Sequence, residues 1–222
     1  ALLDAGKYDE AIAAFDQALA IDANHARTYA LRGQAYWLKD ELEHALADLD
    51  RALELAEDAD AYGTRGAVYT ALHRYPEAID DFDLALRLAP DNAWTLAQRG
   101  YAYYLSDDFD AALLDLTQAI RLTPQYVWAI IVRGTTYNGR ADYAKALLDL
   151  TRALSLEPDN DWALATRGST YRALGEYRKA IADLNRALTL NPTYQWAMAE
   201  RGQTYQEMGD NTKALADFTV VI

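Results

Sequence analysis

The stretch RGYAYYLSDDFDAALLDLTQAIRLTP, residues 99–124, decides the fold, because its pattern returns along the chain. It opens with an Arg-Gly pair, a tyrosine follows three residues after the glycine, and Ala112, Leu116 and Ala119 come later at helical spacing. The interval between successive pairs is 34 residues, with one of 33, and the pairs are Arg32-Gly33, Arg65-Gly66, Arg99-Gly100, Arg133-Gly134, Arg167-Gly168 and Arg201-Gly202. A fixed period of this length is typical of a repeat architecture.

The pattern within each unit predicts two packed helices, because spacings of three and four residues place side chains on one helix face. The glycine lets the first helix approach the second closely, and alanines on the second helix do the same from the other side. Proline ends four of the second helices, and Asn92 and Asn160 then supply N-capping oxygens for the next helix. No stretch shows strand alternation, so we expect an all-α protein.

The pattern resembles the tetratricopeptide repeat family over essentially the whole chain. That resemblance implies an α-solenoid, a right-handed superhelix of antiparallel helix pairs, with about six full repeats after a partial one. Two departures stand out: arginine replaces the leucine often found before the glycine, and other large apolar residues replace the tryptophan often found four residues before it. We expect one array over residues 1–222, made of a partial unit 1–25 and units 26–58, 59–92, 93–126, 127–160, 161–194 and 195–222.

An aspartate stands sixteen residues after every one of these arginines. The matched charges predict a structural ladder of ion pairs across the two helices, either within a unit or to a neighbouring unit. Arginine suits this role because its planar guanidinium can bind a carboxylate through two hydrogen bonds. The predicted pairs are Arg32 with Asp48, Arg65 with Asp81, Arg99 with Asp115, Arg133 with Asp149, Arg167 with Asp183, and Arg201 with Asp217.

The resemblance also implies that the first helices line a concave, partner-binding face. Residues six and three before the glycine, and one, four and five after it, share a stripe of the first helix, and four of the five tryptophans fall on it. The candidate partner-binding residues on this stripe are Trp94, Tyr101, Tyr104, Trp128, Thr135, Asn138, Trp162, Arg172, Trp196 and Gln206.

Two interpretations of the tryptophans stay open at this point. A residue that recurs once per repeat can cover the preceding turn and replace the missing buried tryptophan, or it can form an aromatic groove, since Trp, Tyr and Arg dominate interface hot spots. The lysine and asparagine with which some family members hold a C-terminal carboxylate have no counterpart; the matching positions of the first repeat hold Ala30 and Gln34. That mode of binding is therefore disfavoured.

Composition disfavours several classes of function. A net charge of −13 disfavours nucleic acid and anionic membrane surfaces. Residues 1–66 carry 14 acidic against 6 basic residues, an excess interpreted first as a contribution to solubility and alternatively as a preference for a basic partner at this end. There is no cysteine, no phosphate-binding loop and no nucleophile motif, and His25, His44 and His73 share no metal-ligand spacing. Asp107, Asp108 and Asp110 are interpreted as helix caps. We expect no catalytic residue, no cofactor and no metal.

The predicted function is therefore a non-enzymatic scaffold that binds a protein or peptide. Two alternatives are an arm of a larger signalling or assembly protein and an oligomerisation module, because the chain starts near Ala1-Leu2-Leu3 and stops at Val220-Val221-Ile222 without polar capping helices. Residues 1–7 do not resemble a signal peptide and no apolar run is long enough to span a membrane, so we expect a cytoplasmic protein.

Overall fold

The computed structural model describes residue 3 and residues 5–221, with Val221 as backbone only. The described residues contain helices and turns but no strand, which confirms the predicted all-α class. The helices are α1 (Tyr8–Ile21), α2 (Ala26–Leu38), α3 (Leu42–Leu55), α4 (Ala59–Ala71), α5 (Tyr75–Leu88), α6 (Ala93–Leu105), α7 (Phe109–Leu122), α8 (Val127–Gly139), α9 (Tyr143–Leu156), α10 (Asp161–Ala173), α11 (Tyr177–Leu190), α12 (Gln195–Glu207) and α13 (Asn211–Val221).

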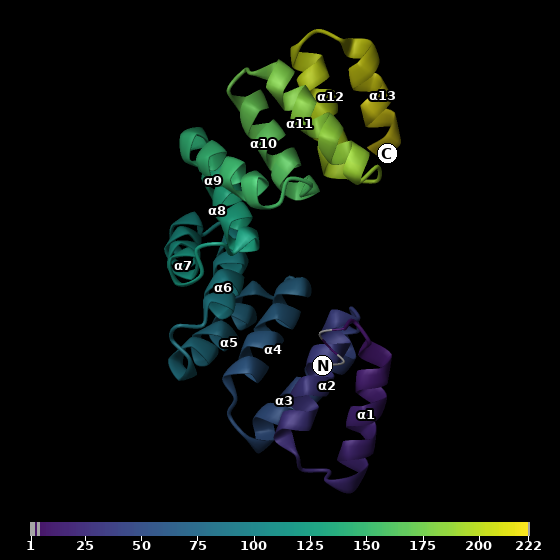
Figure 1. Ribbon diagram of the computed structural model, residues 1–222, viewed down its shortest axis with the longest axis vertical. Helices are drawn as coiled ribbons and strands as arrows, with labels where there is room; N and C mark the ends of the chain where they lie inside the picture. Colours follow the sequence, from purple (N-terminus) through teal and green to yellow (C-terminus); the bar gives the residue numbers. More distant parts are fainter. Residues whose placement is uncertain (1–2, 4, 222) are drawn as a thin grey trace. The chain divides into compact units, whose positions relative to one another are not determined.

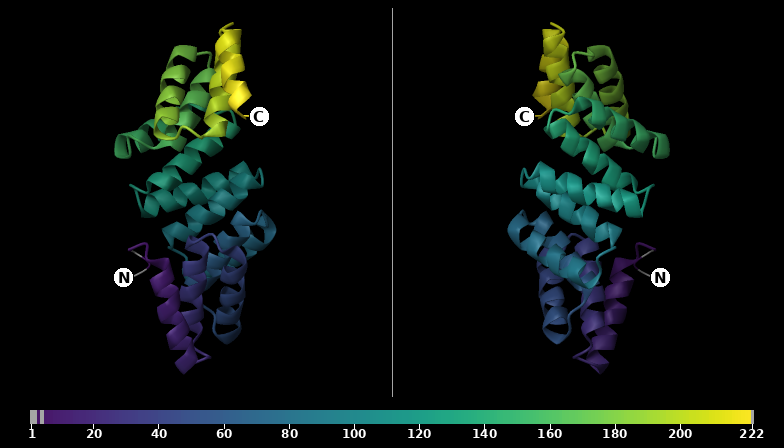
Figure 2. Two further views of the ribbon diagram at one scale, coloured as in Figure 1. Left: turned by 90° about the vertical axis from the view of Figure 1, so that its right-hand side faces the viewer. Right: turned by 90° about the vertical axis from the view of Figure 1, so that its left-hand side faces the viewer.

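These helices group into two compact units, residues 1–122 with α1 to α7 and residues 123–222 with α8 to α13 (Figures 1 and 2). Within each unit, consecutive helices pack against each other as in a solenoid, most extensively the two helices of one repeat. Leu3 lies in a turn before α1 rather than in a helix. Ala1, Leu2 and Ile222, which entered the expectation of bare apolar ends, lie outside the described residues.

Glycine determines how closely the two helices of a repeat approach. A Cβ added to Gly100 would lie 2.8 Å from Cγ of Leu116, which is closer than carbon atoms pack. The alanine and the Leu or Phe of the facing helix are fully buried in most repeats, as Ala112 and Leu116 are. Asn92 and Asn160 accept hydrogen bonds from Thr95 N and Ala163 N, at 3.0 and 2.9 Å, and so cap α6 and α10 as predicted. Asp108 caps the next helix in the same way, at 3.1 Å from Ala111 N.

The turn inside each repeat needs one residue in the left-handed backbone region. The residue seven positions after the repeat glycine has a positive φ in all six full repeats, and the residues are Asp40, His73, Asp107, Ala141, Gly175 and Gly209. The amide that follows it donates to the carbonyl of the repeat tyrosine, for example Asp142 N to Tyr137 O at 2.9 Å, which closes a Schellman-type turn. Only two of the six positions hold glycine, and among the other four Ala141 is the most strained, because aspartate and histidine tolerate the left-handed region better than alanine does.

Ala141→Gly is therefore expected to stabilise the protein by about 0.5–1 kcal/mol, because φ is +60° there and glycine adopts this conformation without the Cβ penalty. The matched control is Ala182→Gly, at an exposed position inside α11, where the same substitution should destabilise by about 1 kcal/mol. Chemical denaturation of both variants measures the two effects. Shifts of the same sign would show that the turn is not strained.

The arginine ladder lies on the packed side of the helix pair. Each arginine donates from Nε and Nη2 to the two oxygens of the aspartate sixteen residues later, at 2.6–2.9 Å. Five of the six aspartates are buried. The hydrogen bonds to Asp81 raise the pKa of Arg65 above its ordinary value, against burial, which lowers it. In three repeats the repeat tyrosine also lies beside the guanidinium, as Tyr103 does 6.0 Å from Arg99.

A further hydrogen bond carries the ladder from one repeat to the preceding one. In residues 1–122 the Nη1 atoms of Arg32, Arg65 and Arg99 donate to the exposed carboxylates of Asp16, Asp50 and Asp83, at 2.5–2.7 Å. In residues 123–222 the corresponding acceptors are neutral: Thr151 for Arg167 and Asn185 for Arg201. The sequence left open whether the ion pairs form within a repeat or between repeats. Each of the six arginines pairs with the aspartate of its own repeat, and the five arginines named above also donate a hydrogen bond to a residue of the preceding repeat.

Candidate functional site

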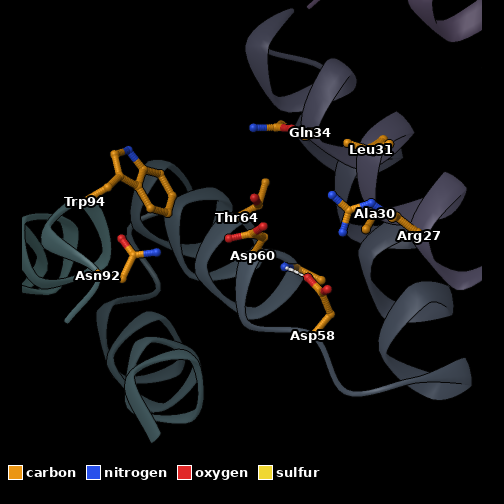
Figure 3. Close-up of a pocket in the computed structure, with 10 residues that line it drawn as sticks. Arg27, Ala30, Leu31, Gln34, Asp58, Asp60, Thr64, Asn92 and Trp94 are labelled. Carbon is orange, nitrogen blue, oxygen red and sulfur yellow. Dashed lines mark hydrogen bonds between the residues drawn. The ribbon is translucent and has the colours of Figure 1, made fainter. Parts of the chain in front are cut away.

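A pocket of about 330 Å³ lies on the first helices of three successive repeats (Figure 3). All of its residues belong to the unit formed by residues 1–122. They are Arg27, Ala30, Leu31 and Gln34 of α2, Asp60, Ala61 and Thr64 of α4 with its N-cap Asp58, and Trp94 of α6 with its N-cap Asn92.

The register of the repeat explains why these residues converge. Arg27, Asp60 and Trp94 each stand six residues before the glycine of their helix, so they occupy one repeat position on three neighbouring helices. Ala30 and Gln34 occupy two other positions of the predicted stripe. Part of that stripe therefore lines a pocket, at the N-terminal end of the predicted set, of which only Trp94 is a pocket residue.

Trp94 is half-buried and packs on one side against the core of its unit. A Cβ on Gly63 would lie 3.0 Å from the Cζ3 atom of the indole, and the ring meets Trp37 edge to face, with centroids 6.2 Å apart. The same tryptophan contacts a core formed by Ala67, Ala78, Phe82 and Ala102. Trp94 thus has the packing role that the sequence left open, and its place in the pocket keeps the recognition role as a prediction.

Several polar groups of the pocket are not used by the fold. Asp58 and Asn92 each cap a helix, through Ala61 N at 2.8 Å and Thr95 N at 3.0 Å. By contrast, the side chains of Arg27, Gln34 and Asp60 make no hydrogen bond or ion pair with any residue that the structure describes. The same holds for the hydroxyl of Thr64.

Thr64 is the least expected member of this set. It is only 5% exposed, and buried hydroxyls are nearly always hydrogen-bonded in folded proteins. Most buried threonines follow this rule by donating to the carbonyl four residues earlier, as Thr70 does to Gly66 O at 2.9 Å. Thr166, at the same repeat position as Thr64, is a second exception, since its buried hydroxyl has no partner among the described residues. An unused hydroxyl at a pocket wall is available to a bound molecule.

The aromatic residues predicted further along α6 form a small cluster of their own. The rings of Tyr101 and Tyr104 stack with centroids 6.2 Å apart, and Tyr104 lies 6.1 Å from Phe109. Burial raises the pKa of both hydroxyls. Neither tyrosine lines the pocket, so the structure does not join them to Trp94 in one site there.

The predicted residues in the second unit are largely occupied by internal contacts. Thr135 is buried and its hydroxyl donates to Ile131 O at 2.9 Å, so the expectation that it faces a partner is corrected. Asn138 accepts a hydrogen bond from the Thr170 hydroxyl at 3.0 Å. Trp128 and Trp162 are half-buried, whereas Trp196 and Gln206 are exposed.

Arg172 also has internal partners. It pairs with the buried Glu200 at 3.1 Å and with Glu207 at 2.9 Å, so its charge is balanced within the unit. A partner that used this guanidinium would have to compete with two carboxylates.

Arg27, Asp60 and Thr64 are pocket residues that the repeat pattern does not predict. The first two had a detectable signal, because they break the tryptophan series at one repeat position in the two repeats that precede Trp94. Thr64 had none: its position, two before the glycine, holds leucine, glutamine, valine, threonine and glutamate in the other repeats.

Comparisons with known proteins agree on the architecture. A model described as TPR repeat matches residues 1–40 and 168–209, and two models described as tetratricopeptide repeat match residues 57–125 and 26–58. No curated protein matches the chain significantly. No helix among the described residues has the length and apolar character needed to cross a bilayer.

Solved structures give the same result. A tetratricopeptide repeat protein from Parabacteroides merdae is 20% identical, with a TM-score of 0.77 over 99% of this chain and 88% of that one. The Cut9-Hcn1 hetero-tetramer of the APC/C contains a chain that is 16% identical, with a TM-score of 0.90; 99% of the present chain aligns with 44% of that chain. YrrB, described as a TPR protein with an unusual peptide-binding site, is 28% identical, with a TM-score of 0.63 over 83% of this chain and 96% of that one.

Proposed function

The chain belongs to the tetratricopeptide repeat family, and we propose that it is a scaffold that binds an extended segment of a partner protein in the pocket between α2, α4 and α6. Proteins of this family are generally protein-interaction scaffolds without catalytic activity. The observation that carries the proposal is the convergence of unused polar groups and one tryptophan on a single pocket. A concave site with a few placed polar groups is the usual form of a binding site.

The relatives support the class of partner but not its identity. YrrB is described as having a peptide-binding site, and its likeness extends over most of both chains. In this chain the pocket is formed by three successive first helices, so a ligand that runs across the helices can contact equivalent positions in turn. An extended peptide has this shape.

Peptides selected from a random 12-residue display library on the full chain test the proposal. We expect their affinity to fall at least about tenfold in Trp94→Ala and severalfold in Thr64→Val, because both residues line the pocket. Trp196→Ala is the matched control: it removes a tryptophan from the same repeat position in the other unit and should leave affinity unchanged.

Circular dichroism establishes that the variants are folded. Thr64→Val keeps the shape of the side chain and removes only the hydroxyl, so it keeps the test valid even where Trp94→Ala loosens the core. Selected peptides that bind both pocket variants as tightly as the unmodified protein would place the binding site elsewhere.

A further inference from the structure

We propose that the pocket between α2, α4 and α6 accepts an arginine side chain of the partner segment. The inference rests on the proposed function and specifies its ligand: a cationic, donor-rich group that lies against Trp94 and bonds to Asp60 and Thr64. Four observations carry it, namely the charge of the unit, the acceptors in the pocket, the aromatic wall and the balance of charge inside the pocket.

The excess of negative charge belongs entirely to the unit that holds the pocket. Residues 1–122 contain 23 acidic and 10 basic residues, whereas residues 123–222 contain 11 of each. The whole net charge of −13 therefore resides in the first unit. Such a field attracts cationic segments and repels acidic ones, over a distance of about 10 Å at an ionic strength of 0.1 M.

The ladder explains part of this asymmetry. Asp16, Asp50 and Asp83 are the acceptors that link repeats in the first unit, and uncharged residues take their place in the second. Each of these arginines in the first unit bonds to two carboxylates, so each cluster of one arginine and two aspartates has a net charge of −1. The acidic field is thus built into the repeat packing.

The pocket offers acceptors that fit a guanidinium. Asp60 and Thr64 lie one helical turn apart on α4, and Figure 3 shows them between Trp94 on one side and Arg27 on the other. A guanidinium has five N–H donors in one plane, so it can donate to the carboxylate of Asp60 and to the hydroxyl oxygen of Thr64 at once. An ammonium group has three donors on a single nitrogen atom, so it is less able to donate to the separate acceptors of Asp60 and Thr64 at once.

Trp94 supplies the face on which a guanidinium stacks. Its indole is fixed by the core contacts at Gly63 and Trp37, so little side-chain entropy is lost when a ligand lies against it. Arginine stacked on tryptophan gains a cation–π attraction of about 0.5–2 kcal/mol.

Arg27 is the one cation among the pocket residues, and it gives the inference a sharp test. Asp58 and Asp60 outnumber it, so the pocket keeps a net negative charge. Arg27 is exposed and makes no ion pair within the described part of the chain. For a cationic ligand Arg27 is repulsive and Asp60 is attractive; for an acidic ligand both signs reverse.

The experiment uses acetyl-Gly-Arg-Gly-amide and its citrulline, lysine and glutamate counterparts as probes of the full chain. Titrations follow the indole N–H signal of Trp94, assigned with Trp94→Phe. We expect the arginine probe to bind about tenfold more tightly than the citrulline probe, which has the same shape without the charge, with lysine between them. Asp60→Asn should weaken arginine binding about tenfold and Arg27→Gln should strengthen it severalfold.

Two substitutions outside the pocket serve as charge-matched controls. Asp80→Asn on α5 and Arg121→Gln on α7 change the charge of the same unit by the same amounts at exposed positions, and should alter affinity less than twofold at an ionic strength of about 0.15 M. Equal binding of arginine and citrulline, preference for glutamate, or reversed effects of Asp60→Asn and Arg27→Gln would overturn the assignment.

The two proposals fail in different ways. Library-selected peptides that depend on Trp94 and Thr64 but lack arginine would overturn the arginine assignment and leave the peptide-binding function intact. Selected peptides that ignore Trp94 and Thr64 would overturn the proposed function and the arginine assignment with it.

Discussion

Arg133→Leu is expected to lower the free energy of unfolding by about 3–5 kcal/mol, because it leaves the carboxylate of Asp149 buried without its two strongest donors. Asp149 is 3% exposed and receives Nε and Nη2 of Arg133 at 2.7 and 2.9 Å. Burial makes this pair unlike a surface ion pair, whose loss costs about 1 kcal/mol or less.

The double variant Arg133→Leu with Asp149→Leu should recover most of that loss, since two apolar side chains of similar size leave no unpaired charge in the core. Urea unfolding of the full chain, fitted with nearest-neighbour coupling between repeats, measures the free energies of unfolding of the unmodified protein, the single variant and the double variant. Lys145→Ala is the control in the same unit; it breaks the exposed pair with Asp142 and should cost less than about 1 kcal/mol. A single variant no less stable than the double one would refute the structural role of the pair.

Gly66→Ala should destabilise the protein by about 1 kcal/mol, although alanine is the better helix former. The added Cβ would lie 2.8 Å from Cε1 of Phe82, and that ring is fully buried and cannot move away cheaply. Overpacking of this kind costs about 1–3 kcal/mol, against a gain of about 1 kcal/mol in helix propensity.

A double-mutant cycle separates these two terms. Phe82→Ala alone should cost about 3–5 kcal/mol, because it empties a buried site. In that background Gly66→Ala should become neutral or stabilising, because the ring it would strike is gone and only the gain in propensity remains. Equal costs of Gly66→Ala in both backgrounds would show that the glycine has another role.

The fold was predictable because the same set of packing residues recurs in six repeats. Glycine, alanine and a large apolar residue recur at fixed spacing, and in helices such spacing allows one close-packed arrangement. The helix caps at Asn92, Asp108 and Asn160 were also predictable, because capping depends only on residues that are neighbours in sequence. The turn at Ala141 was not, because nothing local marks an alanine that must adopt a positive φ.

The binding site was predictable only in part. The stripe on the first helices includes Arg27, Asp60 and Trp94. The repeating pattern predicted the tryptophans at this position, but it did not predict a role for the charged residues that replace tryptophan in two repeats. Thr135 looked accessible in sequence, but it is buried and its hydroxyl donates to Ile131 O of its own helix. Arg172 looked available and is held by Glu200 and Glu207.

The sequence by itself determined the helix pairs, the residues that pack between them and the matching of each arginine with an aspartate, because all of these follow from helical periodicity within one repeat. Only the tertiary structure decided which polar groups remain unused. Whether a hydroxyl such as that of Thr64 bonds to its own helix depends on the side-chain rotamer that packing against neighbouring helices allows, and the spacing of residues along a chain does not contain that information.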